Sequence, residues 1–174
     1  MSARYPTQGI SFLLGLHLIY EYTGGIKAEL YIKNKTAIDY RLHEGPLAGR
    51  WLKSQAAALA NLDAGMGTLS WAEDTGSTTS LVINLKDRWL HSSTFFAKWV
   101  ADNPALTVGY QNDRLTEIHH LRDERPIAPH VHMMQFAKIT FSEYCGTDNE
   151  QVISGDPAGI PSGSRAAATE HEDR

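Results

Sequence analysis

The sequence has little of several features on which many protein functions depend. It contains a single cysteine, Cys145, among 174 residues, which excludes an internal disulfide and any zinc site built from several cysteines. Its 16 basic and 20 acidic residues are not gathered into a block of one sign, so no nucleic-acid partner is indicated. Neither a disulfide framework nor a polyanion-binding surface is therefore expected.

Long apolar runs and export signals are missing as well. The most apolar stretch, residues 10–20, is interrupted by Gly15 and His17 and is shorter than the roughly 20 residues that a membrane-spanning helix needs. Glu21 and Tyr22 follow it, where a signal peptide would have the small residues of a cleavage site. These features predict no membrane partner and favour a cytoplasmic protein.

The common motifs of nucleotide, hydrolase and metal chemistry do not occur. There is no GxSxG nucleophile elbow, and the glycines of residues 23–25 connect two expected strands instead of opening a helix, so no phosphate loop is predicted. The best candidates for metal ligands are two histidine pairs, His119 with His120 and His130 with His132. Adjacent helical side chains diverge, and the second pair has no third ligand at short spacing, so we predict no metal.

What the sequence does contain is repeated alternation of polarity. Hydrophobic residues make up 42% of the chain, which suits one globular domain. Short alternating segments separated by turn residues predict antiparallel strands at residues 16–22, 28–33, 37–42, 48–53, 56–62, 68–73, 80–85, 89–96, 106–111 and 138–144. This number of strands predicts an all-β fold, a closed or flattened antiparallel barrel of the lipocalin or calycin kind. Such a barrel has no exposed sheet edges and can hold one small ligand.

Two segments and both chain ends depart from this pattern. Residues 97–103 and 113–124 have apolar residues at helical spacing and are expected to form short helices beside the barrel. After Ile153 the composition shifts to Gly, Pro, Ser, Ala and charged residues, which is typical of disorder. We therefore expect a flexible N-terminus over residues 1–10, a barrel domain over 11–154 and a disordered tail over 155–174.

Two tyrosines near the start of the barrel form a candidate binding group. Tyr20 and Tyr22 are two residues apart in the first expected strand, so their side chains point to the same face. Facing the inside of a barrel, the two phenols would donate hydrogen bonds to one acceptor such as a carboxylate. Packing as aromatic core residues is the alternative that the residues leave open.

An arginine and a glutamate form a second candidate group. Arg50 follows a run of small and apolar residues, and Glu73 shares a strand face with Leu69 and Trp71, so both are expected at the inner wall. A carboxyl group there is costly unless it is paired or functional. One interpretation is a structural ion pair. The other is a proton donor whose pKa is raised by desolvation, beside an arginine that also binds an anionic substrate.

Several stretches together resemble the phenolic acid decarboxylase family. They are HLIYEY, YIKNKTAIDYRLHEGPLAGRW, SWAEDTGS, LHSSTFFAKWV, NPALTVGYQND, FAKITF and DNEQVIS, and they extend from residue 12 to residue 154 in the order of the family. The resemblance implies a flattened lipocalin-like barrel, usually a homodimer. It also implies that p-hydroxycinnamic acids such as p-coumaric and ferulic acid are converted to 4-vinylphenols and carbon dioxide without a cofactor.

The resemblance also implies catalytic residues. The YxY tyrosines of the family fall on Tyr20 and Tyr22, its GRW arginine on Arg50 and its SWxE glutamate on Glu73. The tyrosines and the arginine would hold the substrate carboxylate, and the glutamic acid would protonate the alkene carbon that bears it, giving a quinone-methide-like intermediate. A para-phenolate supplies the electrons, so the protein needs to provide an acid, positioning and a dry cavity.

Departures from the family pattern concentrate at the expected ring end of the cavity. A pocket tryptophan is replaced by Ile26, and a tyrosine associated with the phenol is replaced by Ala28, while Asp74 stands where a proline is usual. We expect a larger, less polar cavity with altered ring specificity. The residues expected to contact the small aromatic acid are Tyr40, Ile26, Ala28, Leu47 and Thr75.

Two other functions remain open from the sequence. The same barrel would serve an enzyme acting on a different unsaturated acid, or one that hydrates a vinylphenol. It would also serve a non-catalytic calycin-like carrier of aromatic acids, in which Arg50 and the tyrosines clamp a carboxylate. A carrier has no need of Glu73 beside a bound anion, so the glutamate favours an enzyme.

Overall fold

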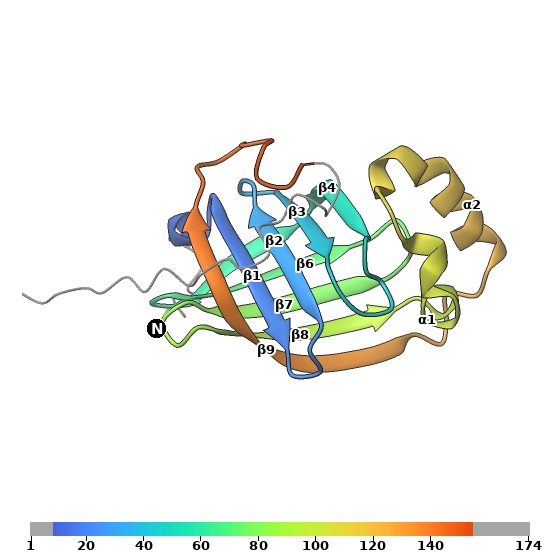
Figure 1. The fold of residues 1–174 in the computed structure, drawn as a ribbon, viewed down its shortest axis with the longest axis horizontal. Coiled ribbons are helices and arrows are strands. Elements are labelled where there is room, and N and C mark those ends of the chain that lie inside the picture. The colour runs from blue at the N-terminus through green and yellow to red at the C-terminus, as the bar shows by residue number, and fades with distance from the viewer. Residues whose placement is uncertain (1–8, 155–174) are drawn as a thin grey trace, which may run out of the picture.

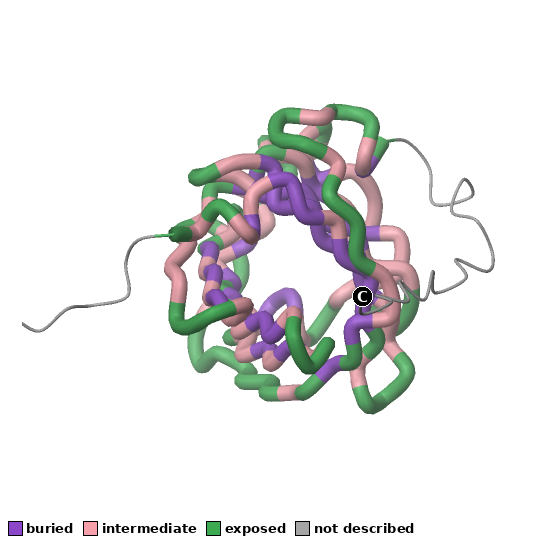
Figure 2. Tube along the Cα trace, turned by 90° about the vertical axis from the view of Figure 1, so that its left-hand side faces the viewer, coloured by how far each residue is buried: buried purple, intermediate pink, exposed green. Residues whose placement is uncertain are grey.

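A computed structural model describes residues 9–154 of the chain. These residues form a nine-stranded antiparallel sheet with the strand order β4-β3-β2-β1-β9-β8-β7-β6-β5, curled into a nearly closed barrel (Figure 1). Seen along the barrel, the chain encircles a centre (Figure 2). The all-β barrel expected from the alternation is confirmed. The expected disordered tail, and residues 1–8 of the expected flexible N-terminus, lie outside the described residues.

The strands are β1 (Leu16–Tyr22), β2 (Lys27–Ile32), β3 (Ala37–Leu42), β4 (Trp51–Ala56), β5 (Ala58–Asp63), β6 (Met66–Ala72), β7 (Thr78–Asn84), β8 (Trp89–Phe96) and β9 (Val131–Tyr144). The described helices are α1 (Lys98–Asp102) and α2 (Leu115–Glu124), with short 3-10 turns η1 (Ile10–Phe12), η2 (Pro104–Thr107) and η3 (Gln111–Arg114). The sequence predicted both α-helices, and the structure places them at one end of the barrel (Figure 1). None of the described helices has the length and apolar character needed to cross a membrane.

Two strand predictions are wrong, and a third is displaced by three residues, because β4 covers Trp51–Ala56 and not residues 48–53. The segment 106–111 does not form a strand, because Gly109 has a φ of 101° and the chain turns there. An aromatic side chain of this segment has another role: the ring of Tyr110 stacks on the ring of Trp51, with centroids 3.9 Å apart. The last strand begins at Val131 instead of at residue 138. Among its additional residues, Met134 and Phe136 are exposed apolar side chains on the outer face, so the half-buried pattern on which the prediction relied is absent there.

Alternation along the strands places one apolar face toward the barrel interior. The largest hydrophobic cluster comes from most strands of the sheet and includes Leu16, Leu18, Leu30, Ile38, Leu69, Leu81, Leu90 and Ile139, all at most 1% exposed. β4 and β5 are the two edge strands of the sheet. Where these two edges of the barrel approach each other, the Gln55 side chain of β4 donates from Nε2 to the carbonyl of Ala72, the last residue of β6, at 3.0 Å.

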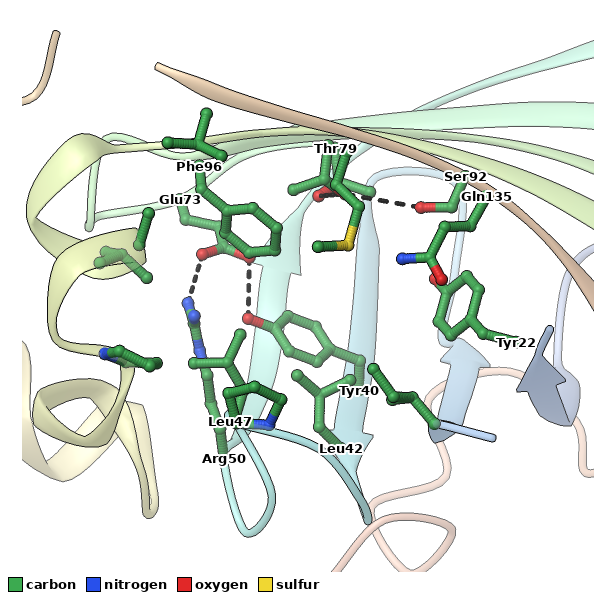
Figure 3. A pocket seen from close by; sticks show the side chains of 18 of the residues that line it. Tyr22, Tyr40, Leu42, Leu47, Arg50, Glu73, Thr79, Ser92, Phe96 and Gln135 are labelled. Carbon is green, nitrogen blue, oxygen red and sulfur yellow. Dashed lines mark hydrogen bonds and ion pairs between the residues drawn. The ribbon is translucent and has the colours of Figure 1, made fainter. Parts of the chain in front are cut away.

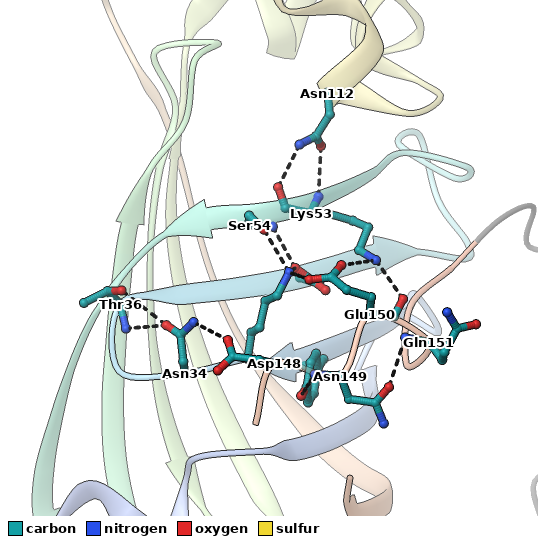
Figure 4. A network of polar contacts seen from close by, with 12 residues as sticks. Asn34, Thr36, Lys53, Ser54, Asn112, Asp148, Asn149, Glu150 and Gln151 are labelled. Atoms are coloured by element: carbon teal, nitrogen blue, oxygen red, sulfur yellow. Dashed lines mark hydrogen bonds and ion pairs between the residues drawn. The ribbon is translucent and has the colours of Figure 1, made fainter. Parts of the chain in front are cut away.

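Residues 145–154 cross the outer face of β2, β3 and β4 (Figure 4). Glu150 forms ion pairs with Lys33 and with Lys53, the latter at 2.7 Å. The Tyr31 hydroxyl donates to the Gly146 carbonyl at 2.5 Å. This segment covers part of the outer face of the sheet, so the outer face is buried there as well as the inner one.

Candidate active site

A cavity of about 310 Å³ lies inside the barrel (Figure 3). Apolar side chains dominate its wall, among them Ile26, Leu42, Leu47, Phe96, Val131 and Met133. A small number of polar groups from β1, β3, the β6–β7 turn, β8 and β9 interrupt this lining. A mainly apolar cavity of this size with a few placed polar groups is typical of a binding site for a small organic molecule.

The carboxyl group of Glu73 is the most heavily hydrogen-bonded group in the cavity wall. Its Oε2 forms an ion pair with Arg50 and accepts from Thr75 Oγ1 at 3.1 Å. Its Oε1 accepts from the Tyr40 hydroxyl at 2.9 Å and from Trp71 Nε1 at 3.2 Å. Two of these bonds are drawn in Figure 3. The sequence left open whether Glu73 and Arg50 meet, and the structure shows that they do.

The local backbone explains how Glu73 reaches the cavity. β6 ends at Ala72, and a tight turn follows in which Glu73 N donates to the Ser77 carbonyl at 2.8 Å and Gly76 N donates to the Glu73 carbonyl at 2.9 Å. Gly76 has a φ of 88°, which glycine adopts without a steric penalty. The carboxyl group therefore projects from the end of a strand on a rigid turn.

Arg50 is a buried cation, with 2% of its surface exposed. Burial alone would lower its pKa, but the neighbouring Glu73 carboxylate and Tyr40 outweigh that effect and raise the pKa of the guanidinium above its usual value. Among the described residues, none accepts a hydrogen bond from its Nε atom. Burying an ion pair contributes little to stability in general, so the pair points to a role in binding or chemistry.

The tyrosine pair occupies a different part of the cavity. The rings of Tyr20 and Tyr22 meet edge to face, with centroids 5.6 Å apart. Burial raises the pKa of both phenols, so both are protonated hydrogen-bond donors near neutral pH. Tyr22 lies across the cavity from Arg50, beside Gln135 and Ser92 (Figure 3). The cavity thus has one polar end with an ion pair and another with hydroxyl and amide groups.

Only some of the residues expected to contact a substrate line the cavity. Tyr40, Ile26 and Leu47 line the cavity. Burial raises the pKa of Tyr40, which keeps its hydroxyl protonated. Thr75 is not among the lining residues, and its hydroxyl contacts the Glu73 carboxylate, which gives it a supporting position behind the wall.

Ala28 is fully buried and is not among the lining residues either. In the sheet it is paired with Tyr20 on one side and with Leu42 on the other, and both of these neighbours line the cavity. Directly paired residues point to the same face. The methyl group of Ala28 therefore faces the interior but ends short of the cavity, and a longer side chain at this position would enter it.

Several residues that line the cavity were not predicted from the sequence. Met133 and Gln135 lie on the part of β9 that was not predicted to be a strand, and Ser92 on β8 had no assigned role. The only available signal was the period of two in Val131, Met133 and Gln135. That signal was obscured by Met134 and Phe136, apolar residues at alternate positions of the same segment.

The histidines considered as metal ligands have no part in this wall. His119 Nε2 lies 2.7 Å from Asp74 Oδ1 on the surface. Ligand-type atoms within 4.8 Å of one another occur at His17, Glu143 and Cys145, on the outer face of β1 and at the end of β9. The chemistry available in the cavity is that of carboxyl, guanidinium, hydroxyl and amide groups.

Comparison with known proteins identifies the family. A family model for phenolic acid decarboxylase (PAD) matches residues 10–167. The chain belongs to the phenolic acid decarboxylase family. Membership makes this protein a decarboxylase, that is a carboxy-lyase.

Individual relatives agree with this assignment. The chain is 39% identical over 155 residues to "Probable phenolic acid decarboxylase" of Vibrio cholerae, covering 89% of each protein. It is 41% identical over 144 residues to phenolic acid decarboxylase PadC of Bacillus subtilis, covering 83% of this chain and 89% of that protein. A crystal structure from Burkholderia vietnamiensis covers 78% of this chain and 97% of its own with a TM-score of 0.50 and 11% identity, which shows similarity of fold alone.

Proposed function

We propose that this decarboxylase acts on p-hydroxycinnamic-type acids, that is aromatic acrylic acids, and releases a vinylphenol and carbon dioxide. The names of the two curated relatives support a phenolic acid as the substrate. The observation that carries the proposal is the Glu73 carboxyl group, held by Arg50, Tyr40 and Trp71 in the wall of an otherwise mainly apolar cavity. Such a group is suited to deliver one proton to a carbon atom of a bound aromatic acid.

Glu73 is the proton donor in this proposal, and Arg50 binds the substrate carboxylate. The two side chains are in contact, so an acid group that pairs with Arg50 brings its α-carbon close to Glu73. The negative charge of that acid competes for the guanidinium and favours a proton on Glu73, because two neighbouring carboxylates repel each other. Protonation of the α-carbon then breaks the alkene double bond.

The para-hydroxyl group of the substrate supplies the electrons. Its ring oxygen releases its proton along the hydrogen bonds to the groups around it and pushes electron density toward the alkene, which gives a quinone-methide-like intermediate; the ring oxygen takes this proton back when the aromatic ring is restored. The bond between the α-carbon and the carboxyl carbon then breaks, carbon dioxide leaves, and its bonding electrons restore the aromatic ring and the vinyl double bond. The low-dielectric cavity strengthens each of these electrostatic effects.

The tyrosine pair is assigned to the ring oxygen in this scheme. The resemblance to the family implied that Tyr20 and Tyr22 hold the carboxylate together with Arg50. Tyr22, however, lies across the cavity from Arg50 and beside Gln135 (Figure 3). With the carboxylate at Arg50, the far end of the molecule extends toward the tyrosines, whose protonated phenols stabilise the developing phenolate by hydrogen bonds.

The proposed reaction requires no cofactor, because the substrate ring carries the charge that a cofactor would otherwise stabilise. Full activity after exhaustive dialysis against a metal chelator is the expected result. Loss of activity on dialysis with recovery on addition of a divalent metal would contradict cofactor independence.

We also propose a homodimer that uses the outer face of β8 and β9. Phe95, Met134 and Phe136 on this face are 44%, 60% and 59% exposed, which is unusual for large apolar side chains in a monomer. Light scattering on purified protein should give twice the monomer mass, and Phe136→Glu should shift it to the monomer. A monomeric wild-type protein would contradict this proposal.

The test of the proposed function is turnover of p-coumaric, ferulic, caffeic and unsubstituted cinnamic acid, followed by acrylate absorbance and by mass analysis of the products. Vinylphenols should form from the para-hydroxylated acids alone, and Glu73→Gln should abolish turnover while retaining binding. A hydrated product would favour the hydratase alternative. Binding of all four acids without any turnover would favour a carrier.

The orientation of the substrate has its own test. Tyr22→Phe removes one hydroxyl, so it should weaken binding of p-coumaric acid, measured by calorimetry, and leave binding of cinnamic acid almost unchanged. Equal weakening of both acids would instead place the tyrosines at the carboxylate.

A further inference from the structure

The proposed reaction consumes one proton from the solvent in each turnover. The substrate enters as a carboxylate and leaves as neutral carbon dioxide, and the vinylphenol retains the proton that Glu73 delivered. The Glu73 carboxylate must therefore be protonated again before the next turnover. While substrate or product fills the main cavity, it separates the carboxylate from water on that side, and a second path to the solvent would return the proton without waiting for product release.

A second, small cavity adjoins the same carboxyl group. It has a volume of about 10 Å³, and its polar wall is formed by Arg50, Glu73, Asp74, Thr75 and Gln111. This volume is close to the smallest space that holds one water molecule, and such a water needs two or more polar partners. The polar wall provides them.

The unpartnered Arg50 Nε atom is a second, independent reason to place a water molecule here. Arg50 lines the small cavity, and its Nε is buried without an acceptor among the described residues. Buried donors of this kind are nearly always satisfied, by ordered water where no protein group is available. A water molecule in the small cavity would accept from Nε and donate to the Glu73 carboxylate.

The outer end of this path lies at the protein surface. Asp74 follows Glu73 directly, and its Oδ1 is 2.7 Å from His119 Nε2 of α2. Their side chains are 46% and 42% exposed. Arg122 of the same helix donates to the Asp74 carbonyl at 3.3 Å, so α2 is held against the turn that carries Glu73. An imidazole side chain can take up a proton on one ring nitrogen and give one off from the other.

We infer that Asp74 and His119 form a proton-return path to Glu73, connected by one water molecule in the small cavity. The inference rests on the proposed function, in which Glu73 is the acid. His119 gives a proton to the Asp74 carboxylate, Asp74 gives its proton to the water, and the water gives another proton to Glu73. His119 then takes up a proton from the solvent, so each turnover moves one proton inward and changes no other bond.

The test uses Asp74→Asn and His119→Asn in the full-length protein, with p-coumaric acid as substrate. The amide side chains form hydrogen bonds but do not relay protons, so kcat should fall at least about tenfold. KM should stay close to that of the wild type, because the groups proposed to bind the substrate are untouched. Imidazole added at increasing concentration should restore kcat in the variants and have no effect on the wild type. His120→Asn, at a neighbouring position of α2, is the matched control and should keep the wild-type kcat.

Three results would overturn the inference. They are an unchanged kcat in both variants, a reduced kcat that imidazole does not restore, and a KM that rises together with the loss. In the last two cases the pair only holds the turn in place. Failure of the proposed function is distinguishable, because the wild-type enzyme itself would then release no carbon dioxide from p-coumaric acid.

Discussion

Glu29 is expected to be the single residue on which the acid stability of this barrel depends most. It lies on β2, is 3% exposed, and accepts hydrogen bonds from His17 at 2.8 Å, Arg41 at 3.0 Å and His43 at 2.7 Å. Burial alone would raise the pKa of this carboxyl group. The two histidines and the arginine outweigh burial and hold the pKa far below the usual glutamate value of 4.5.

Glu29→Gln keeps the shape of the side chain and removes its charge. Arg41, itself 5% exposed, would then lose the charged carboxylate oxygen that lies 3.0 Å from its Nε atom. Removing one partner of a buried ion pair typically costs about 3–5 kcal/mol of unfolding free energy. For a domain of this size 1 kcal/mol corresponds to roughly 2–4 °C in Tm, so Tm should fall by about 6–20 °C.

The effect should depend on pH with a definite sign. Because the pKa of Glu29 is lower in the folded state, its stabilisation is fully present above the unfolded value of 4.5 and is lost as the pH falls toward the folded value. The difference in unfolding free energy between the wild type and Glu29→Gln should thus be largest near neutral pH and shrink below about pH 4.5.

Urea denaturation followed by circular dichroism, near neutral pH and in acid, measures both quantities. The matched control is Glu21→Gln, at an exposed position of β1, which should change the unfolding free energy by no more than about 0.5 kcal/mol. The reasoning would be refuted if Glu29→Gln lowered the unfolding free energy as little as the control does. It would also be refuted if the decrease were the same at acidic pH as at neutral pH.

Three further predictions concern other positions of the barrel. Ala28→Tyr should extend a ring into the cavity and raise kcat/KM for p-coumaric acid relative to cinnamic acid; if kcat/KM does not rise, another residue is responsible for the altered ring specificity. Gly67→Ala should destabilise the protein by about 1–3 kcal/mol in thermal unfolding, because its Cβ would lie 2.6 Å from a methyl group of Leu13; an unchanged Tm would show that Leu13 moves at no cost. Tyr31→Phe removes two hydrogen bonds to residues 145–154 and should speed limited proteolysis of that segment, and an unchanged cleavage rate would contradict its docking.

Much of the fold followed from local sequence patterns. The period of two along β1, β3 and β8 predicted these strands with their observed bounds, because alternate burial is a local property of a strand with one face in a core. The residues of α1 and α2 were likewise predicted as helical. Prediction failed at 106–111 and at 131–137, where stacking on Trp51 and exposed outer-face side chains changed the pattern.

The residue types of the active site also came from the sequence. Glu73 and Arg50 stood out as polar residues at positions expected to face inward, and the resemblance to the family added the tyrosines. Their roles did not follow from position in the chain. The direct ion pair of Glu73 with Arg50 joins side chains 23 residues apart, and Tyr22 proved to lie on the other side of the cavity (Figure 3).

The sequence by itself thus determined a barrel with an acid, a cation and phenols facing its interior, because strand periodicity dictates which side chains point inward. Only the tertiary structure decided which of them touch. Contacts such as that of Asp74 with His119, 45 residues apart, depend on how the sheet closes, on its register and on how α2 sits against the β6–β7 turn. These are properties of the whole barrel, and no local stretch of residues encodes them.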